Sequence, residues 1–147
     1  MAKKLEVTLK WDGPWKYPVN VPKRAGIYMV IAGSKLSNGN WNTVSYELLD
    51  IGQSGDTGVR LDAHDRKNCW NAKKSANKTV LFKFAPMSSA TYDENDRRIV
   101  ECCLRASTKP PCGTECIKGY NREESVTITN KGKHTPLKKE YSCKPPS

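Results

Sequence analysis

Four side chains suited to phosphoryl chemistry occur in order along the chain: Tyr28, Arg60, His64 and Glu101. Hydrolysis of a phosphodiester needs a positioned water, a group that takes its proton, and positive charge on the phosphoryl and leaving oxygens. Tyr28 can be that base if nearby positive charge acidifies its phenol. Arg60 stays charged and donates two hydrogen bonds to phosphate. His64 can relay a proton or hold the water, and Glu101 can bind one hard divalent ion, Mg²⁺ or Mn²⁺.

Two tripeptides accompany these residues. Residues 26–28 read Gly-Ile-Tyr and residues 50–52 read Asp-Ile-Gly, and Arg60 follows Gly52 by eight residues. With His64 one helical turn further on and Glu101 on a later helix, this order resembles the GIY-YIG nuclease family. The resemblance covers roughly residues 25 to 121 and implies a metal-dependent DNA endonuclease of restriction or repair type.

The resemblance also implies roles for particular residues. It makes Glu101 the metal ligand. The substrate-binding set that we expect comprises Gly52, Gln53, Lys67, Lys73, Lys74 and Asn121, the last as a match for the trailing asparagine of the family.

One position departs from the family pattern. The second motif normally begins with Tyr, and here that residue is Asp50. An ionised carboxylate donates no hydrogen bond and places negative charge beside the expected phosphate. Asp50 is therefore expected to serve as a partner of a metal or a lysine, or else to weaken the site. Tyr46 points to the same side of an ideal strand but lies too far along it to be a simple replacement.

Each candidate also has an ordinary structural interpretation. Tyr28 can pack on the sheet, Arg60 can pair with Asp56 or His64, and Glu101 can form a surface ladder with Arg97 and Arg105 at i−4 and i+4. Such ladders stabilise by only about 0.3–0.5 kcal/mol per pair. The alternative function is a catalytically inactive nucleic-acid-binding module on the same fold.

The charge distribution favours a polyanionic partner. The chain carries a net charge of +10, and no acidic residue occurs between Asp65 and Asp93. A row of basic residues occupies that interval: Arg66, Lys67, Lys73, Lys74, Lys78 and Lys83. We expect DNA as the partner, with RNA as an open alternative, no membrane, and a monomer or homodimer. Trp70 lies within this row, where a core position is favoured over base stacking.

The hydropathy pattern predicts an α+β fold, a small antiparallel sheet flanked by helices. Strands are expected at residues 5–11, 26–32, 46–51, 79–85 and 125–129. A first helix is expected from a cap at Asp56 or Thr57 to about Trp70, and a second from a cap near Asp93 to the prolines at 110–111. The chain then divides into an extension (1–24), a nuclease-like core (25–121) and a C-terminal strand with a basic tail (122–147) on the same domain.

The six cysteines are expected to be reduced thiols. The first residues show no apolar segment typical of a secretory signal, so a cytoplasmic location is the prediction. The pair Cys112 and Cys116 has no second pair to complete a zinc site, although Cys103 or Cys143 can be recruited in space. Buried thiols are therefore favoured over a structural zinc.

Overall fold

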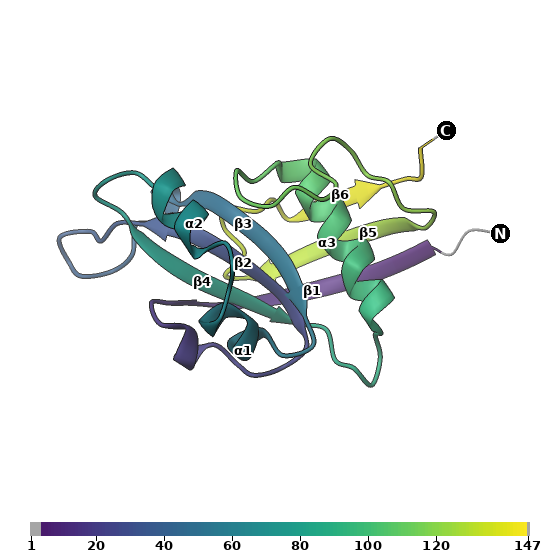
Figure 1. Cartoon of the computed structure of the whole chain (residues 1–147), viewed down its shortest axis with the longest axis horizontal. Coiled ribbons are helices and arrows are strands. Elements are labelled where there is room, and N and C mark those ends of the chain that lie inside the picture. Colours follow the sequence, from purple (N-terminus) through teal and green to yellow (C-terminus); the bar gives the residue numbers. More distant parts are fainter. Residues whose placement is uncertain (1–3, 147) are drawn as a thin grey trace.

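Six strands form one sheet in the order β3-β2-β4-β1-β5-β6, in a computed structural model that describes residues 4–146 (Figure 1). The strands are β1 (Lys4–Trp15), β2 (Gly26–Gly33), β3 (Glu47–Ser54), β4 (Thr79–Pro86), β5 (Ser125–Gly132) and β6 (Glu140–Cys143). The helices are α1 (Thr57–Asp62), α2 (Lys67–Lys73) and α3 (Glu94–Thr108), with short 3-10 turns at Pro18–Asn20 and Thr43–Ser45. The predicted α+β class is confirmed.

The sheet is mixed, so the prediction of an antiparallel sheet is wrong in one place. Residues Lys4 to Trp11 of β1 run parallel to β5, whereas the other strand pairs are antiparallel. The 12–14 segment does not end β1, because a bulge at Gly13, with a φ of +107°, lets the strand continue and pair with β4. The alternation of apolar and polar residues gave the strand but not its neighbours, since a pairing partner leaves no local signal.

Two apolar clusters lie on opposite faces of β2, whose eight residues are all buried. On one face, Ile27, Met29 and Ile31 join the buried side of α3 and the inward residues of β1. On the other face, Tyr28 and Val30 join residues of α1, α2 and β4. A strand covered on both faces reads as a continuous apolar run, and this is the pattern of residues 26–33.

The predicted helix from about 58 to 70 is two short helices. Asp56 caps α1 as predicted, with its side chain accepting from the Val59 N–H at 3.3 Å, but the helix ends at Asp62. The break contains His64, whose Nδ1 accepts from the Arg66 N–H at 3.1 Å, and such a local bond competes with helix continuation. Helix α3 agrees with prediction: Asp93 and Asp96 form a capping box, and Lys109 ends it in a left-handed conformation.

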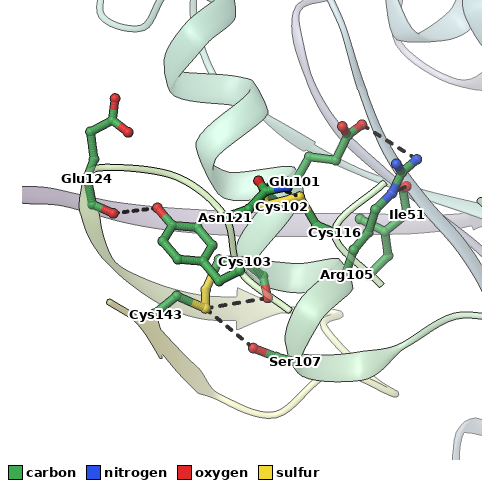
Figure 2. Close-up of a disulfide and its surroundings, with 11 residues drawn as sticks. Ile51, Glu101, Cys102, Cys103, Arg105, Ser107, Cys116, Asn121, Glu124 and Cys143 are labelled. Carbon is green, nitrogen blue, oxygen red and sulfur yellow. Dashed lines mark hydrogen bonds and ion pairs between the residues drawn. A yellow bond between two sulfur atoms is a disulfide. The ribbon is translucent and has the colours of Figure 1, made fainter. Parts of the chain in front are cut away.

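All six cysteines are paired, which corrects the prediction of reduced thiols. The bonds are Cys69–Cys112, Cys102–Cys116 and Cys103–Cys143, and no free cysteine is found in residues 4–146. The adjacent residues Cys102 and Cys103 of α3 bond in different directions, to the 109–121 loop and to β6 (Figure 2). Bonded sulfurs are not available as zinc ligands. Spacing along the chain did not show these pairs because the fold, not the sequence, brings them together.

Candidate active site

Tyr28 and Gly52 sit opposite each other at the centre of the candidate site. The register of the β2–β3 hairpin pairs Tyr28 with Gly52, so the Gly-Ile-Tyr and Asp-Ile-Gly segments lie side by side. A Cβ on Gly52 would lie 2.1 Å from the Tyr28 hydroxyl oxygen and 2.2 Å from its Cζ. The phenol therefore lies directly over residue 52, and only glycine leaves room for it.

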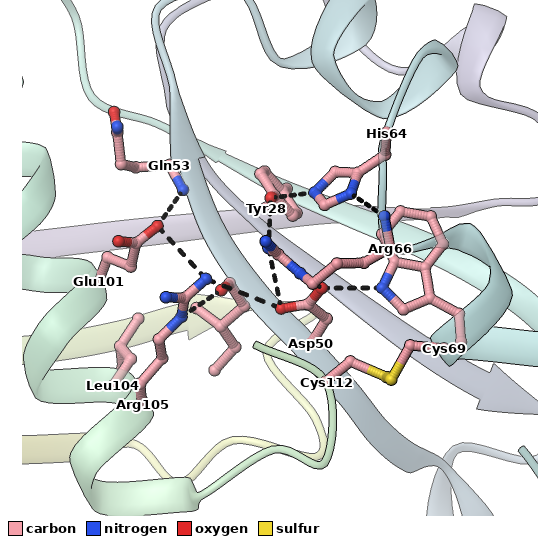
Figure 3. Close-up of polar contacts among 12 residues, drawn as sticks. Tyr28, Asp50, Gln53, His64, Arg66, Cys69, Glu101, Leu104, Arg105 and Cys112 are labelled. Carbon is pink, nitrogen blue, oxygen red and sulfur yellow. Dashed lines mark hydrogen bonds and ion pairs between the residues drawn. A yellow bond between two sulfur atoms is a disulfide. The ribbon is translucent and has the colours of Figure 1, made fainter. Parts of the chain in front are cut away.

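The Tyr28 hydroxyl is held by two nitrogen groups that follow α1 in the chain. His64 Nε2 lies 2.6 Å from it, and Arg66 Nη2 donates to it at 3.3 Å (Figure 3). Because the Arg66 backbone N–H donates to His64 Nδ1, the proton of a neutral ring belongs on Nε2. In that tautomer the Tyr28 oxygen accepts from both neighbours.

Asp50 is fully buried and takes part as an anchor for cations and donors. Its Oδ2 accepts from Arg66 Nε at 2.7 Å and from Trp70 Nε1 at 2.8 Å. Arg105 Nη2 lies 3.9 Å from its other oxygen. The partners of Asp50 are therefore an arginine and an indole, and not the metal or lysine that the sequence predicted. Trp70 is a buried core residue, as the sequence favoured.

Glu101 lies on the other side of the β3 edge and bonds to the strand itself. Its Oε2 accepts from the Gln53 N–H at 2.8 Å, and Arg105 Nη2 lies 3.8 Å from the same oxygen. Arg105 Nε also donates to the Ile51 carbonyl at 2.8 Å. These two side chains satisfy backbone groups that an edge strand leaves unpaired. The predicted ladder is half present: Arg105 pairs with Glu101, whereas Arg97 donates to the Gln53 side chain at 3.0 Å.

Arg60 lies beside the cluster formed by Tyr28, Asp50, His64 and Arg66, and it pairs with an exposed carboxylate that another ligand can replace. It lies on α1 and donates to Asp65 Oδ1 at 3.0 Å, not to Asp56 or His64. The same Asp65 oxygen lies 3.3 Å from His64 Nδ1, so Arg60 and His64 meet at Asp65 although the helix between them has ended. The Asp65 side chain is 76% exposed, and exposed ion pairs of this kind stabilise by about 0–1 kcal/mol.

Burial dominates the electrostatics of the cluster. It raises the pKa of Tyr28, to which the charge of Asp50 adds, while Arg66 and Arg60 act in the opposite direction. The base role expected of Tyr28 requires nearby positive charge to lower the pKa of its phenol. Arg66 and Arg60 do face the phenol, but they do not outweigh desolvation and Asp50, so the requirement is not met. Burial also lowers the pKa of His64 to about 3, helped by Arg66 and Arg60, so the imidazole is neutral. Burial raises the pKa of Glu101.

The remaining predicted residues are spread around the cluster. Gly52 and Gln53 belong to it through Tyr28 and Glu101. Lys67 donates to the Asp62 carbonyl, and Lys73 and Lys74 end α2. Tyr46 packs in the opposite core, where Lys83 Nζ lies 4.7 Å from its ring centre, so it does not substitute for the missing tyrosine. The Asn121 amide oxygen lies 3.4 Å and 3.3 Å from the sulfurs of the Cys102–Cys116 bond.

Sequence reasoning missed three members of the site: Arg66, Trp70 and Arg105 in their contacts with Asp50. The charge pattern favours Arg66 as the start of a basic row, and the i, i+4 spacing favours Arg105 as part of a surface ladder with Glu101. One signal was available: an acidic residue in the middle of an apolar strand must be buried, and a buried carboxylate requires cationic or N–H partners nearby.

A divalent ion has one carboxylate available here. Within residues 4–146, no group of three or more His, Cys, Asp or Glu side chains is placed to hold a metal. The Glu101 Oε2 is engaged by Gln53 and Arg105. Mg²⁺ keeps several waters and often uses one or two carboxylates with substrate phosphate, so a single carboxylate is compatible with this ion but does not by itself indicate a metal site.

Comparison with known proteins gives no family assignment. No protein-family model, curated protein or solved structure matches the chain. The helices of the described part of the chain are also too short or too polar to cross a membrane.

Proposed function

We propose that the protein is a metal-dependent endonuclease that hydrolyses phosphodiester bonds in DNA, with a site of the GIY-YIG kind. The observation that carries the proposal is the 2.6 Å contact between the Tyr28 hydroxyl and His64 Nε2. Arg60 reaches the neighbourhood of His64 through Asp65, whose Oδ1 lies 3.0 Å from Arg60 Nη2 and 3.3 Å from His64 Nδ1, and Glu101 lies across β3, bonded to the Gln53 N–H. Residues from β2, α1, α3 and the segment after α1 supply them.

The roles follow from the contacts. Arg60 exchanges its exposed partner Asp65 for a phosphate oxygen, at small cost because surface ion pairs are weak. Because the pKa of Tyr28 is raised, its phenolate is the minor form at neutral pH. In the proposed mechanism Tyr28 first gives its proton to solvent, and the phenolate then accepts the proton of the attacking water as the new P–O bond forms. The bond to the leaving oxygen breaks, and that oxygen takes a proton from solvent. His64 Nε2–H holds the Tyr28 oxygen in place throughout.

Glu101 would hold Mg²⁺ or Mn²⁺ through Oε1. Such an ion, when bound, neutralises charge on the phosphoryl and leaving oxygens. The Gln53 N–H fixes the carboxylate through its other oxygen, and this keeps Oε1 in one orientation.

The test is cleavage of supercoiled plasmid DNA with Mg²⁺. We expect the wild type to nick or linearise the plasmid, and Arg60→Ala and Glu101→Ala to lose this activity. Matched controls come from an exposed pair on α3, Arg98 and Glu94, 3.4 Å apart, and Arg98→Ala and Glu94→Ala should cut normally. Cutting that survives both site substitutions, or a wild type that does not cut, refutes the proposal.

A second candidate is a nucleic-acid-binding module without catalysis. It is favoured by the Tyr28 side chain, which is 1% exposed and has a raised pKa, and by Asp50 in place of the usual tyrosine. Fluorescence anisotropy with labelled duplex DNA between 50 and 200 mM salt separates the two. Steeply salt-dependent binding without any cleavage supports the module, since phosphate contacts release counterions.

The three disulfides bear on location. Such bonds persist in oxidising compartments and are rare in the cytosol, so they favour an oxidising compartment over the predicted cytoplasm.

A further inference from the structure

The side chain of Arg66 connects the two motif positions of the site. Its Nε donates to Asp50 Oδ2 at 2.7 Å, and its Nη2 lies 3.4 Å from Asp50 Oδ1 and 3.3 Å from the Tyr28 hydroxyl. The guanidinium therefore faces the carboxylate with one edge and the phenol with one of its terminal nitrogens (Figure 3). The plane of the guanidinium fixes these directions relative to each other.

Asp50 and Arg66 differ in how far their side chains are exposed to solvent. The Asp50 side chain is fully buried, whereas that of Arg66 is 25% exposed. A substrate that approaches Tyr28 therefore meets the cation and not the carboxylate. The negative charge at position 50 does not occupy the expected phosphate position, because it lies beneath Arg66 and Trp70.

Arg66 also acts through its backbone. Its N–H donates to His64 Nδ1 at 3.1 Å and so places the ring proton on Nε2, toward Tyr28. The side chain and the main chain of one residue thus determine both donors to the phenol oxygen. Two N–H donors on one oxygen stabilise it more when it is negative than when it is neutral.

We propose that Arg66 is a catalytic residue of the site, and that Asp50 and Trp70 are positioning residues which hold its guanidinium against the Tyr28 hydroxyl. A carboxylate–guanidinium pair thereby takes the place of the phenol that usually begins the second motif. The inference rests on the proposed nuclease function. Arg66 compensates the charge of the Tyr28 phenolate that receives the proton from water, and its exposed edge is available to a phosphate oxygen.

The experiment compares Arg66→Ala and Arg66→Lys with Arg98→Ala, which removes an exposed cation of α3 that pairs with Glu94. With plasmid DNA and Mg²⁺, we expect Arg66→Ala to lose about 10²- to 10³-fold in cleavage rate, as for the loss of one preorganised donor. Arg66→Lys should be intermediate, and millimolar guanidinium should restore part of the Arg66→Ala activity but none to Arg60→Ala. Asp50→Asn should lower the rate less than Arg66→Ala. Near-ultraviolet circular dichroism checks that each variant is folded.

A second measurement keeps the inference distinct from the proposed function. Spectrophotometric titration of the Tyr28 phenol, with Tyr28→Phe as the reference, does not need cleavage. The charged or titratable groups that act on this phenol are Asp50, Arg60, His64, Arg66 and Glu101. We expect Arg66→Ala to raise the titration midpoint and Arg98→Ala to leave it unchanged.

The possible results distinguish failure of the inference about Arg66 from failure of the proposed nuclease function. If the wild type does not cleave, the proposed function fails, and the titration alone decides whether Arg66 acts on Tyr28. If the wild type cleaves and Arg66→Ala cuts within threefold of it, the inference about Arg66 is overturned and the nuclease proposal stands. Equal losses in Arg66→Ala and Arg98→Ala would also overturn it, because they would indicate an effect of general positive charge and not of the Arg66 contacts.

Discussion

The substitution Gly52→Ala tests the geometry of the site without any assumption about activity. The new Cβ would lie 2.1 Å from the Tyr28 oxygen and 2.2 Å from Cζ, in a well-packed region where Tyr28 is 1% exposed. Real contacts of this kind stay above 3.0 Å, so the ring must move by most of an ångström. Overpacking of one methyl group in a core costs about 1–3 kcal/mol. We expect Gly52→Ala to lower the unfolding free energy by that amount.

Gly55→Ala is the matched control. Its Cβ would meet only the end of the Arg97 side chain at 3.7 Å, an ordinary contact, and we expect a change within about 0.5 kcal/mol. Urea unfolding of both variants measures the difference between their unfolding free energies. Thermal unfolding should show the same difference as a lower Tm of Gly52→Ala, by about 2–4 °C per kcal/mol for a chain of this size.

A double-mutant cycle identifies the cause. Tyr28→Ala removes the ring that the new methyl group would strike, so Gly52→Ala should cost little in that background. If Gly52→Ala and Gly55→Ala have equal effects, or if the Gly52→Ala cost persists without the Tyr28 ring, the phenol does not lie over residue 52 and the reasoning about the site is refuted.

Three further predictions concern cysteines and buried titratable groups. Intact mass after alkylation under denaturing conditions should show no adduct before reduction and six after it, and any adduct before reduction contradicts the pairing. The unfolding free energy should fall as pH drops from about 6.5 toward 3, because the unfolded state binds a proton that the neutral, buried His64 of the folded state does not bind. The unfolding free energy of His64→Gln should fall less steeply over the same pH range. Burial, with the nearby charge of Lys133, lowers the pKa of Lys83 to about 8, so the unfolded state binds more protons between pH 8 and about 10.4. Stability should therefore rise in that window relative to Lys83→Met, and parallel curves would contradict this.

The local elements of the fold were predictable because their signals are local. The alternation of apolar and polar residues predicted β1, the continuous apolar run at residues 26–32 predicted β2, and the capping residue Asp93 predicted the start of α3. What the sequence could not show were contacts between distant residues: the parallel pairing of Lys4 with Ser125, and the bond between Cys103 and Cys143. The same holds for Glu101, whose contact with the Gln53 backbone depends on how α3 crosses the edge of β3.

The same distinction between local signals and contacts of distant residues applies to the candidate site. The two strands that carry the motifs were predictable from their local apolar patterns, but the register that sets Tyr28 opposite Gly52 was not. The predicted i, i+4 geometry of Arg60 and His64 failed because α1 ends between them, yet both side chains still reach Asp65. Asp50 was recognised as a departure from the pattern, and its meaning required the positions of its buried partners.

The place of β1 in the sheet has a consequence for the order of folding. β1 lies between β4 and β5, so its apolar face and one of its edges stay uncovered until α3 and β5 have been added. Long-range pairings of this kind form slowly, whereas the β2–β3 hairpin and the neighbouring β4 are close in the chain. We therefore expect the half of the site that bears Tyr28 to form early and the half that bears Glu101 to dock late. A chain interrupted before β5 would contain α3 but lack Cys143, the partner of Cys103, and would expose the edge of β1 to other chains.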